Sequence, residues 1–544
     1  MSANIYNCFP KLLKMIQLII WATVAIVVLV LYVNKKLNYF KQFKIRHLPT
    51  TFGFGNMFKN VIKQEHFFDI VDNGYKAFPK DRFIGSYEFL VPTFIIRDIE
   101  LIKAIGVKDF DYFTDHRPFT HEEERFFSKS LFALKGEKWR NMRSTLSPAF
   151  TASKLRNMVP FMQECSQNLS SHCLEEIKKN NKDGSIVLDI RDILQRYATD
   201  VIATCAFGLS SNSIAENNEF YNKGYQLTNT TSIQFLKFFF AISFPKVANF
   251  LKMDLFSGEA TEFFTRVFLS TMKHRENNNI YRPDMLQLLM EAQKGTLRHE
   301  DVKEEKDAGF ATVLESDVGK KTAKYEWDDA HIVAQAMLLF FAGFDTVSTA
   351  MTFLLHELAI NQDIQQRLHE EIDETLEKYN GKLDYDKINQ MKFLDMCISE
   401  TLRRWPPTGT TDRICLKDYP IGKPNDDAPS FVLPKNGVIT IPVQSIHYDE
   451  QHYPNPHKFD PERFSDENKH NITPYIYLPF GIGPRNCVGS RFALAEIKTM
   501  AIDLLKHFNI SPSASTQIPL KLDPASLNAK IKGGHRLTFT LRSK

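Results

Sequence analysis

The segment of residues 480–489 constrains the fold most, because it holds one cysteine in a short loop with three glycines. Glycine allows backbone geometries and close approaches that residues with a β-carbon resist. Residues 490–505 follow with the pattern of a helix. A thiolate just before a helix N-terminus is stabilised by the helix dipole and by a nearby cation, here Arg485. Cys487 is therefore a candidate metal ligand, although most single cysteines are small buried residues.

The spacing around this cysteine matches a known pattern. The sequence Phe-x-x-Gly-x-Arg-x-Cys-x-Gly is filled without a gap by Phe480, Gly483, Arg485, Cys487 and Gly489. It resembles the haem-binding signature of the cytochrome P-450 superfamily. The resemblance implies that Cys487 is the proximal iron ligand of haem b (iron protoporphyrin IX), that Arg485 meets a haem propionate and that Phe480 lies beside the thiolate. Such a ligand pushes electron density toward the metal and favours O–O cleavage.

A second constraint lies near the N-terminus, where residues 15–33 carry no charged side chain. As a helix rising about 1.5 Å per residue, this stretch nearly matches a bilayer core of about 30 Å. A cleavable signal peptide has a shorter apolar region and a small-residue cleavage site, which residues 31–34 do not offer. We expect a membrane anchor at residues 1–34, followed by a basic linker at residues 35–50.

Basic residues are distributed unevenly around the apolar stretch. Two lysines precede it, and five Lys or Arg residues follow it before residue 47. Since the more basic side stays cytoplasmic, the body is expected to face the cytosol. Structural disulfides are not expected in that reducing compartment. The net charge of +4 is too mild to indicate nucleic-acid binding.

The remaining chain predicts a mainly α fold with small β-sheets (α+β), as one catalytic domain over residues 51–544. Stretches typical of strands occur at residues 83–105, at residues 434–443 and, after a Gly-Gly turn, at residues 537–541. Most other segments have helical periodicity. A charged stretch at residues 295–325 could be a linker, but we interpret it as a surface loop because the motifs on both sides serve one site.

Residues 328–359 are expected to form a long buried helix with a polar interruption. Gly343, Asp345 and Thr346 stand where helix propensity favours none of them. A packing glycine and a threonine bonded back to its own helix would explain the pattern without chemistry. The superfamily resemblance implies an oxygen-activation segment instead. In it, Thr346 orients a proton donor toward dioxygen, Asp345 belongs to the delivery route and Gly343 leaves room for the oxygen.

A structural network is implied on the other side of the haem. Glu400 and Arg403 share one helix face, where an exposed pair would contribute only about 0.2 to 0.5 kcal/mol. By resemblance Arg463, within residues 459–464, completes a Glu-Arg-Arg network with them. A buried carboxylate needs such cations and hydrogen bonds to be tolerated.

Haem also brings two propionates, which call for cations or good hydrogen-bond donors. Besides Arg485, the resemblance assigns this role to Trp139, Arg143 and Arg413. In the loop before Trp139, His116 and Arg117 are both candidates for a further contact, and the sequence does not choose between them.

Residues 228–252 are rich in phenylalanine, which indicates either core packing or an apolar lid that touches the bilayer. We favour the lid, because the resemblance puts substrate entry there. Further pocket candidates are carried over by location only: residues 126–134, 339–341, 408–410 and 526–529.

The motifs follow the superfamily's order along the chain, and residues 341–348 and 412–415 look most like insect microsomal enzymes of family nine. The resemblance implies a monooxygenase in the endoplasmic reticulum membrane that inserts one atom of dioxygen into a lipophilic substrate, xenobiotic or endogenous. A haem-thiolate isomerase or dehydratase and a non-catalytic haem sensor are the alternatives.

Electrons are expected from outside the chain, because the sequence shows no flavin or nicotinamide fingerprint. The resemblance implies NADPH as their source and an NADPH-cytochrome reductase as the partner, with cytochrome b5 as a candidate second donor. Basic residues that could attract an acidic reductase surface are Lys138, Arg140, Arg404, Arg491 and Lys498.

Overall fold

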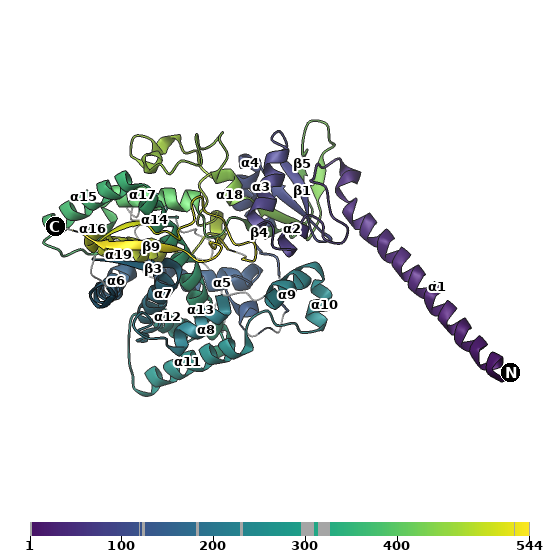
Figure 1. Ribbon diagram of the computed structural model, residues 1–544, viewed down its shortest axis with the longest axis horizontal. Helices are drawn as coiled ribbons and strands as arrows, with labels where there is room; N and C mark the ends of the chain where they lie inside the picture. Colours follow the sequence, from purple (N-terminus) through teal and green to yellow (C-terminus); the bar gives the residue numbers. More distant parts are fainter. Residues whose placement is uncertain are drawn as a thin grey trace.

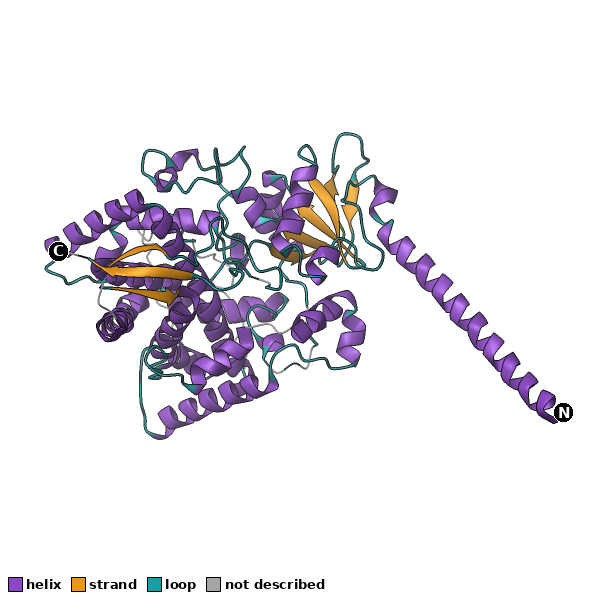
Figure 2. Cartoon of the chain, in the orientation of Figure 1, coloured by secondary structure: helices purple, strands orange, loops and turns teal. Residues whose placement is uncertain are grey.

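A long N-terminal helix projects from a body of helices and small sheets in the computed structural model of the chain (Figure 1). Helices make up most of the body, and the strands gather in separate small groups (Figure 2). The structure describes residues 3–118, 120–121, 124, 126–180, 184–228, 232–294, 309–313, 327–526 and 528–542. Most of the predicted surface loop at residues 295–325 lies outside these ranges.

The helical elements include two π-helices, η2 and η6, and the other η elements are 3-10 helices. In chain order they are α1 (Ala3–Leu37), η1 (Phe40–Phe43), α2 (Phe58–Val61), α3 (Phe67–Ala77), α4 (Ile99–Lys103), η2 (Ala104–Lys108), η3 (Phe110–Tyr112), η4 (Phe127–Lys129), α5 (Gly136–Leu146), η5 (Ser147–Phe150), α6 (Ala152–Asn180), α7 (Ile190–Phe207), α8 (Glu219–Thr228), α9 (Ser232–Ser243), α10 (Pro245–Phe250), α11 (Gly258–Asn277), α12 (Met285–Gln293), α13 (Asp329–Ala342), η6 (Gly343–Val347), α14 (Ser348–Ile360), α15 (Gln362–Lys378), α16 (Tyr385–Asn389), α17 (Lys392–Arg404), α18 (Val443–His447), η7 (Pro461–Phe464), η8 (Lys469–Asn471), η9 (Gly483–Arg485) and α19 (Ser490–His507). The strands are β1 (Phe83–Glu88), β2 (Val91–Ile96), β3 (Ser185–Asp189), β4 (Thr411–Ile414), β5 (Tyr419–Gly422), β6 (Phe431–Leu433), β7 (Val438–Ile441), β8 (Phe508–Pro512) and β9 (Arg536–Leu541).

The strands form three small sheets. The largest has the order β1-β2-β7-β4, in which β2 and β7 are parallel and the other neighbours antiparallel. A second sheet has the antiparallel order β3-β9-β8, and β5 pairs with β6. The strands predicted at residues 83–105, 434–443 and 537–541 are confirmed as β1 with β2, β7 and β9. The predicted mainly α fold with small sheets is likewise confirmed.

The predicted long helix is the central element of the core. It runs from Asp329 to Ile360 as α13, η6 and α14, and the side chain of Asp328 caps it by accepting the N–H of His331 at 2.8 Å. It is apolar enough to cross a membrane, yet 72% of its apolar window is buried inside the body. Because α7, α8, α11 and α19 pack against it, the apolar surface on its several sides is covered by protein.

The anchor helix α1 is long and exposed along most of its length, and Leu13–Phe43 is apolar enough to cross a membrane. Its last turns are different, because Val33 and Leu37 are buried in the core that also holds Phe40 and Ile45. Val33 and Leu37 are one helical turn apart and share a face. The boundary expected at residue 34 therefore falls inside a continuous helix, and its end is packed onto the body.

Phe40 fixes this packing. Its ring is fully buried, with ring centroids 4.9 Å from Tyr87 and 5.3 Å from Phe94. A β-carbon on Gly85 would lie 2.5 Å from the Phe40 ring, so the ring rests directly on the β1 backbone. The end of the anchor is thus held against the largest sheet.

We expect Phe40→Ala to lower the free energy of unfolding by about 3–5 kcal/mol, because it opens a cavity at a fully packed site. The measurement is guanidinium denaturation of the detergent-solubilised full chain. The control is Phe52→Ala, whose ring is 49% exposed and should change stability by about 0.5 kcal/mol or less. Equal losses in the two variants would contradict the packing role of Phe40.

Candidate functional site

The cysteine loop has the tight backbone that its glycines predict. Gly481 and Gly483 have φ values of +78° and +66°, in the left-handed region that favours glycine. A β-carbon on Gly483 would lie 1.8 Å from the carbonyl oxygen of Gly106, so no larger residue fits there. The N–H of Cys487 donates to the carbonyl of Phe480 at 2.8 Å and closes the loop. Three residues later α19 begins, as predicted.

Cys487 is exposed. The other five cysteines whose side chains the structure describes are buried. On the central helix, Ala342 is likewise exposed, between the half-buried Phe341 and Gly343. The helix that follows the cysteine, α19, packs against η6, so the loop and the centre of the long helix belong to one region. A flat group bound between the loop and the helix would require Cys487 and Ala342 to be exposed in this way.

The four residues expected to hold the propionates are brought together. The guanidinium of Arg485 lies 4.4 Å from the centroid of the Trp139 ring and donates to the carbonyls of Thr114 and Leu134 at 2.7 and 2.6 Å. Arg143 donates to the backbone and side-chain oxygens of Asn486 at 2.6 and 2.7 Å.

Positive charge exceeds negative charge in this cluster. Burial, together with the charge of Arg413, holds the pKa of Arg485 well below its usual value. Burial lowers the pKa of Arg413 to about 10, and its buried Nε has no hydrogen-bond partner. The nearest carboxylate to Arg485, Asp115, is 4.0 Å away. Two additional carboxylates would relieve this imbalance, as the propionates of haem do.

His116 and Arg117, between which the sequence did not choose, are both engaged by protein groups. His116 Nδ1 lies 3.0 Å from Asp412, and its ring stacks on Phe132 at 4.3 Å. Burial lowers the pKa of His116 to about 4. Arg117 pairs with Glu88, and its backbone N–H donates to Asp412 at 2.7 Å. The two side chains thus position the segment next to Arg413.

The polar interruption of the central helix is a π-helical turn, η6, of the kind that often marks functional sites. Thr346 Oγ1 donates to the carbonyl of Ala342 at 2.7 Å, which is the back-bonding weighed above. A hydroxyl that donates in this way still has lone pairs to accept a proton donor. A β-carbon on Gly343 would lie 3.2 Å from Ile202 of α7, and the room expected there for the oxygen stays a prediction. Gly343 makes room for helix packing, and the exposed small residue is Ala342.

Asp345 is buried and both of its carboxylate oxygens are bonded. Oδ1 lies 2.6 Å from a guanidinium nitrogen of Arg191, and Oδ2 accepts from the amide of Asn528 at 2.8 Å. Arg191 also donates to Thr349 at 3.1 Å. Arg191 stands in no motif, and residues 526–529 were pocket candidates by location only, so no sequence pattern indicated that α7 and the loop before β9 meet at this acid.

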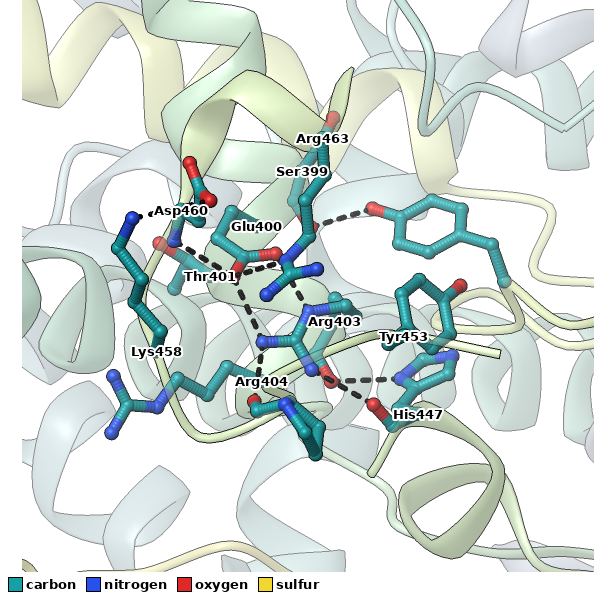
Figure 3. Close-up of polar contacts among 12 residues, drawn as sticks. Ser399, Glu400, Thr401, Arg403, Arg404, His447, Tyr453, Lys458, Asp460 and Arg463 are labelled. Carbon is teal, nitrogen blue, oxygen red and sulfur yellow. Dashed lines mark hydrogen bonds and ion pairs between the residues drawn. The ribbon is translucent and has the colours of Figure 1, made fainter. Parts of the chain in front are cut away.

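The predicted Glu-Arg-Arg network is assembled in the core (Figure 3). Glu400 and Arg403 are fully buried, with Arg403 Nε and a terminal nitrogen 2.6 and 2.8 Å from the two carboxylate oxygens. Arg463 Nε lies 3.5 Å from Glu400, and the backbone N–H of Asp460 donates to the same carboxylate at 3.0 Å. The charge of Glu400 is therefore balanced as a buried carboxylate requires.

His447, which sequence reasoning missed, extends this network to the cysteine loop. Arg403 donates to the carbonyl of His447 at 2.8 Å, and His447 Nδ1 donates back to the carbonyl of Arg403 at 2.8 Å. The N–H of Leu478 donates to Nε2 at 2.9 Å, which fixes the neutral tautomer of the ring. Burial lowers the pKa of His447 to about 3. Leu478 is two residues before Phe480, so α17 and the loop are joined through one ring.

These observations fit a bound haem. Among the described residues, no group of three or more His, Cys, Asp or Glu side chains could hold a bare metal ion. Haem needs one protein ligand on the proximal side, since the porphyrin supplies the other four. The exposed Cys487 is suited to be that ligand, and the arginine cluster would be the partner of two acidic groups.

Comparison with known proteins agrees with this site. A family model described as Cytochrome P450 matches residues 51–537. The chain is 41% identical to cytochrome P450 9e2 of Blattella germanica over 96% of this chain and 97% of that protein. It is 37% identical to probable cytochrome P450 9f2 of Drosophila melanogaster, over 93% and 95% of the two chains. Cytochrome P450 6k1 of Blattella germanica is 36% identical over 96% of each chain. The expected likeness to insect family nine is confirmed.

The network makes a quantitative prediction for Arg403→Met. This change leaves Glu400 buried without its closest cation and should lower the free energy of unfolding by about 3–5 kcal/mol in denaturant titrations. The control is Lys458→Met, because the Lys458 ammonium is 69% exposed and pairs with Asp460 at 3.4 Å. That change should cost about 1 kcal/mol or less. If removing Glu400 as well in the Arg403→Met background restores no stability, the unpaired carboxylate is not the cause.

Proposed function

Since the chain belongs to the cytochrome P450 family, we propose that it is a membrane-anchored haem-thiolate monooxygenase. It inserts one oxygen atom of dioxygen into a lipophilic substrate and takes electrons from NADPH through a partner reductase. The single observation that carries the proposal is the exposed Cys487 on its tight loop. The loop leads into α19, which packs against η6, and the loop's own Arg485 and Asn486 contact the arginine cluster. The proposed catalytic domain covers residues 51–544, after an anchor and a short basic segment.

Haem, when bound, supplies the iron at which dioxygen is activated. The chain's own residues hold it. Cys487 is the proposed iron ligand and Phe480 packs beside it. The propionates are held by the buried cluster of Trp139, Arg143, Arg413 and Arg485.

The proposed proton route uses Thr346 and Asp345. The Thr346 hydroxyl donates to the helix backbone, so its oxygen can accept a hydrogen bond and orient a donor such as water. Arg191 and Asn528 occupy the two carboxylate oxygens of Asp345, so Asp345 can pass a proton on only by exchanging one of these partners. In this proposal Thr346 orients the proton donor near the oxygen site, and Asp345 carries the proton toward it from outside.

Substrate entry is proposed near the membrane, through α9 and α10. The apolar side chains exposed there form a group: Leu236, Phe240, Phe244, Val247, Phe250 and Leu251. Phe238 of α9 packs against the small core of Met57 and Ile70, next to the exposed rings of Phe54 and Phe58. An exposed apolar surface of this kind marks a membrane contact or an entry for apolar ligands. The proposed location is the endoplasmic reticulum membrane, with the body in the cytosol.

The proposed reductase surface is smaller than the sequence predicted. Lys498 was expected there, but its side chain is fully buried and pairs with Asp395 at 2.8 Å. Arg404 is tied to Glu357 at 3.0 Å. Lys138 is exposed, and with the half-buried Arg140 and Arg491 it remains a candidate to attract an acidic partner, either the reductase or cytochrome b5.

Two other activities remain alternatives to the proposal. A haem-thiolate isomerase or dehydratase needs neither electrons nor a proton route, and a haem sensor needs no turnover. Asp345 and Thr346 favour the monooxygenase, because both lie in the π-helical turn that faces the proposed oxygen site.

Cys487→Ala should abolish the thiolate-type spectrum of the ferrous carbon monoxide complex, because the sulfur ligand is removed. The measurement is a difference spectrum of the reduced full chain. Cys173→Ala is the matched control, since this thiol is buried in the core and should leave the spectrum intact. Survival of the spectrum in Cys487→Ala would overturn the ligand assignment.

Thr346→Ala should keep NADPH oxidation while the product formed per NADPH falls by about a hundredfold, at the low end of proton-transfer effects. The assay reconstitutes the chain with reductase and a panel of lipophilic compounds. Thr352→Ala is the matched control, because Thr352 makes the same back-bond, to Ser348 at 2.7 Å, within buried α14. Unchanged coupling in Thr346→Ala would exclude the proton role, and NADPH oxidation without product in the wild type would favour the sensor.

A further inference from the structure

A cavity of about 710 Å³ lies where the anchor helix meets the body, away from the cysteine loop. Its wall combines the end of α1 with the segment that follows as far as Phe52, and Phe78 lies on its other side. None of the residues proposed to hold haem or move protons lines it. The cavity is therefore a separate feature that the oxygen chemistry does not explain.

The anchor sets the depth of this cavity relative to a membrane. The uncharged stretch ends at Val33, and the cavity begins at Asn34 and includes Asn38. At about 1.5 Å per residue, these amides lie roughly 2 to 8 Å beyond the apolar stretch. The headgroup region adds about 5 to 7 Å on each side of the hydrocarbon core. Because Val33 and Leu37 are buried in the body, the cavity is held at headgroup depth.

The lining is amphipathic. Lys41 and Arg46 supply positive charge, and the amides of Asn34 and Asn38 supply hydrogen-bond donors. Phe52 contributes an apolar ring that is 49% exposed. Cations beside amides suit a phosphate group, and the apolar ring suits the chain attached to it.

The cations of the lining are available to an outside anion. Lys41 makes no ion pair among the residues that the structure describes. Arg46 lies 3.4 Å from Asp81, whose side chain is buried, and 3.2 Å from Asp427, whose side chain is 83% exposed. The exposed pair with Asp427 is weak and exchanges readily.

The surrounding sequence adds to the positive potential. No acidic residue occurs before Glu65, whereas Lys35, Lys36 and Lys44 lie beside the two cations of the cavity. Basic segments next to a membrane span attract anionic lipids of the cytoplasmic leaflet. Here a defined cavity is present in addition to that diffuse attraction.

We propose that the cavity binds the headgroup of one anionic glycerophospholipid from the cytosolic leaflet. The phosphate lies between Lys41 and Arg46, and the glycerol and first acyl carbons lie against Phe52. The inference rests on the membrane anchor of the proposed function and is independent of the oxygen chemistry. The bound lipid fills the joint between anchor and body and holds their mutual orientation.

The experiment uses the full chain in nanodiscs of phosphatidylcholine with phosphatidylserine as the minor lipid. The protein is released into mild detergent, and native mass spectrometry counts the lipids that remain bound. We expect one retained phosphatidylserine, enriched about tenfold over its share of the membrane. The double variant Lys41→Gln with Arg46→Gln should lose this lipid. The double variant Lys35→Gln with Lys36→Gln removes the same charge outside the cavity and should retain it.

Three results would overturn the proposal. Equal loss in the two double variants would reduce the effect to diffuse attraction, and equal retention of phosphatidylcholine would remove the selectivity for anionic lipid. Displacement by water-soluble glycerol 3-phosphate at the concentration of the lipid would assign the cavity to free phosphate esters. The single variant Lys41→Glu guards against a folding artefact, because Lys41 is exposed and its replacement should not disturb folding. This variant by itself should abolish lipid retention.

The ferrous carbon monoxide spectrum of each variant separates this proposal from the monooxygenase. Loss of the lipid with an intact thiolate-type spectrum supports the lipid site in a folded protein. A retained lipid in a chain without that spectrum would overturn the proposed oxygen chemistry and leave the lipid site standing.

Discussion

The buried ion pair of Glu400 and Arg403 is the interaction on which the site depends. Each partner would be costly alone in the core, and together they also bind the carbonyls of His447 and Pro456 and the N–H of Asp460. Both partners lie on α17, so it is their bonds to other segments that fix the position of this helix: a shift of α17 would break the bonds to His447, Pro456 and Asp460. Through the ring of His447 the same constraint reaches the segment that leads into the cysteine loop.

The second electrostatic feature is the cluster around Arg413 and Arg485, in which positive charge exceeds negative charge. Around Arg413 and Arg485 the protein gathers buried cations. Burial lowers the pKa of both side chains, and the charge of Arg413 adds to the lowering at Arg485. The charge of Glu400, by contrast, is paired within the protein. Binding of a dianionic cofactor would thus stabilise the fold by linkage, as any ligand that prefers the native state does.

Much of the fold could be predicted, because strong patterns were present. The alternating strands, the buried central helix and the helix after Cys487 all follow from periodicity and from glycine positions. The resemblance also named residues that the structure brings together, such as Trp139 with Arg485 and Glu400 with Arg403.

The remainder depends on tertiary contacts that leave no local signal. Arg191 and Asn528 meet Asp345 from segments far apart in the chain, and an isolated arginine or asparagine in a sequence is most often a surface residue. Lys498 is the opposite case. From the sequence it was expected to attract an acidic partner at the surface, but its side chain is buried and pairs with Asp395. Periodicity assigns faces to helices, but it does not say which partners they meet.

The parallel pairing of β2 with β7 has a consequence for how the chain is made. Thr93 pairs with Val438, so the largest sheet is complete only when most of the chain has been synthesised. At about 5 to 20 residues per second, residue 438 leaves the ribosome roughly 20 to 70 s after residue 93. During that interval the β1–β2 hairpin presents an unpaired edge. The nascent chain must protect this edge until translation supplies its partner.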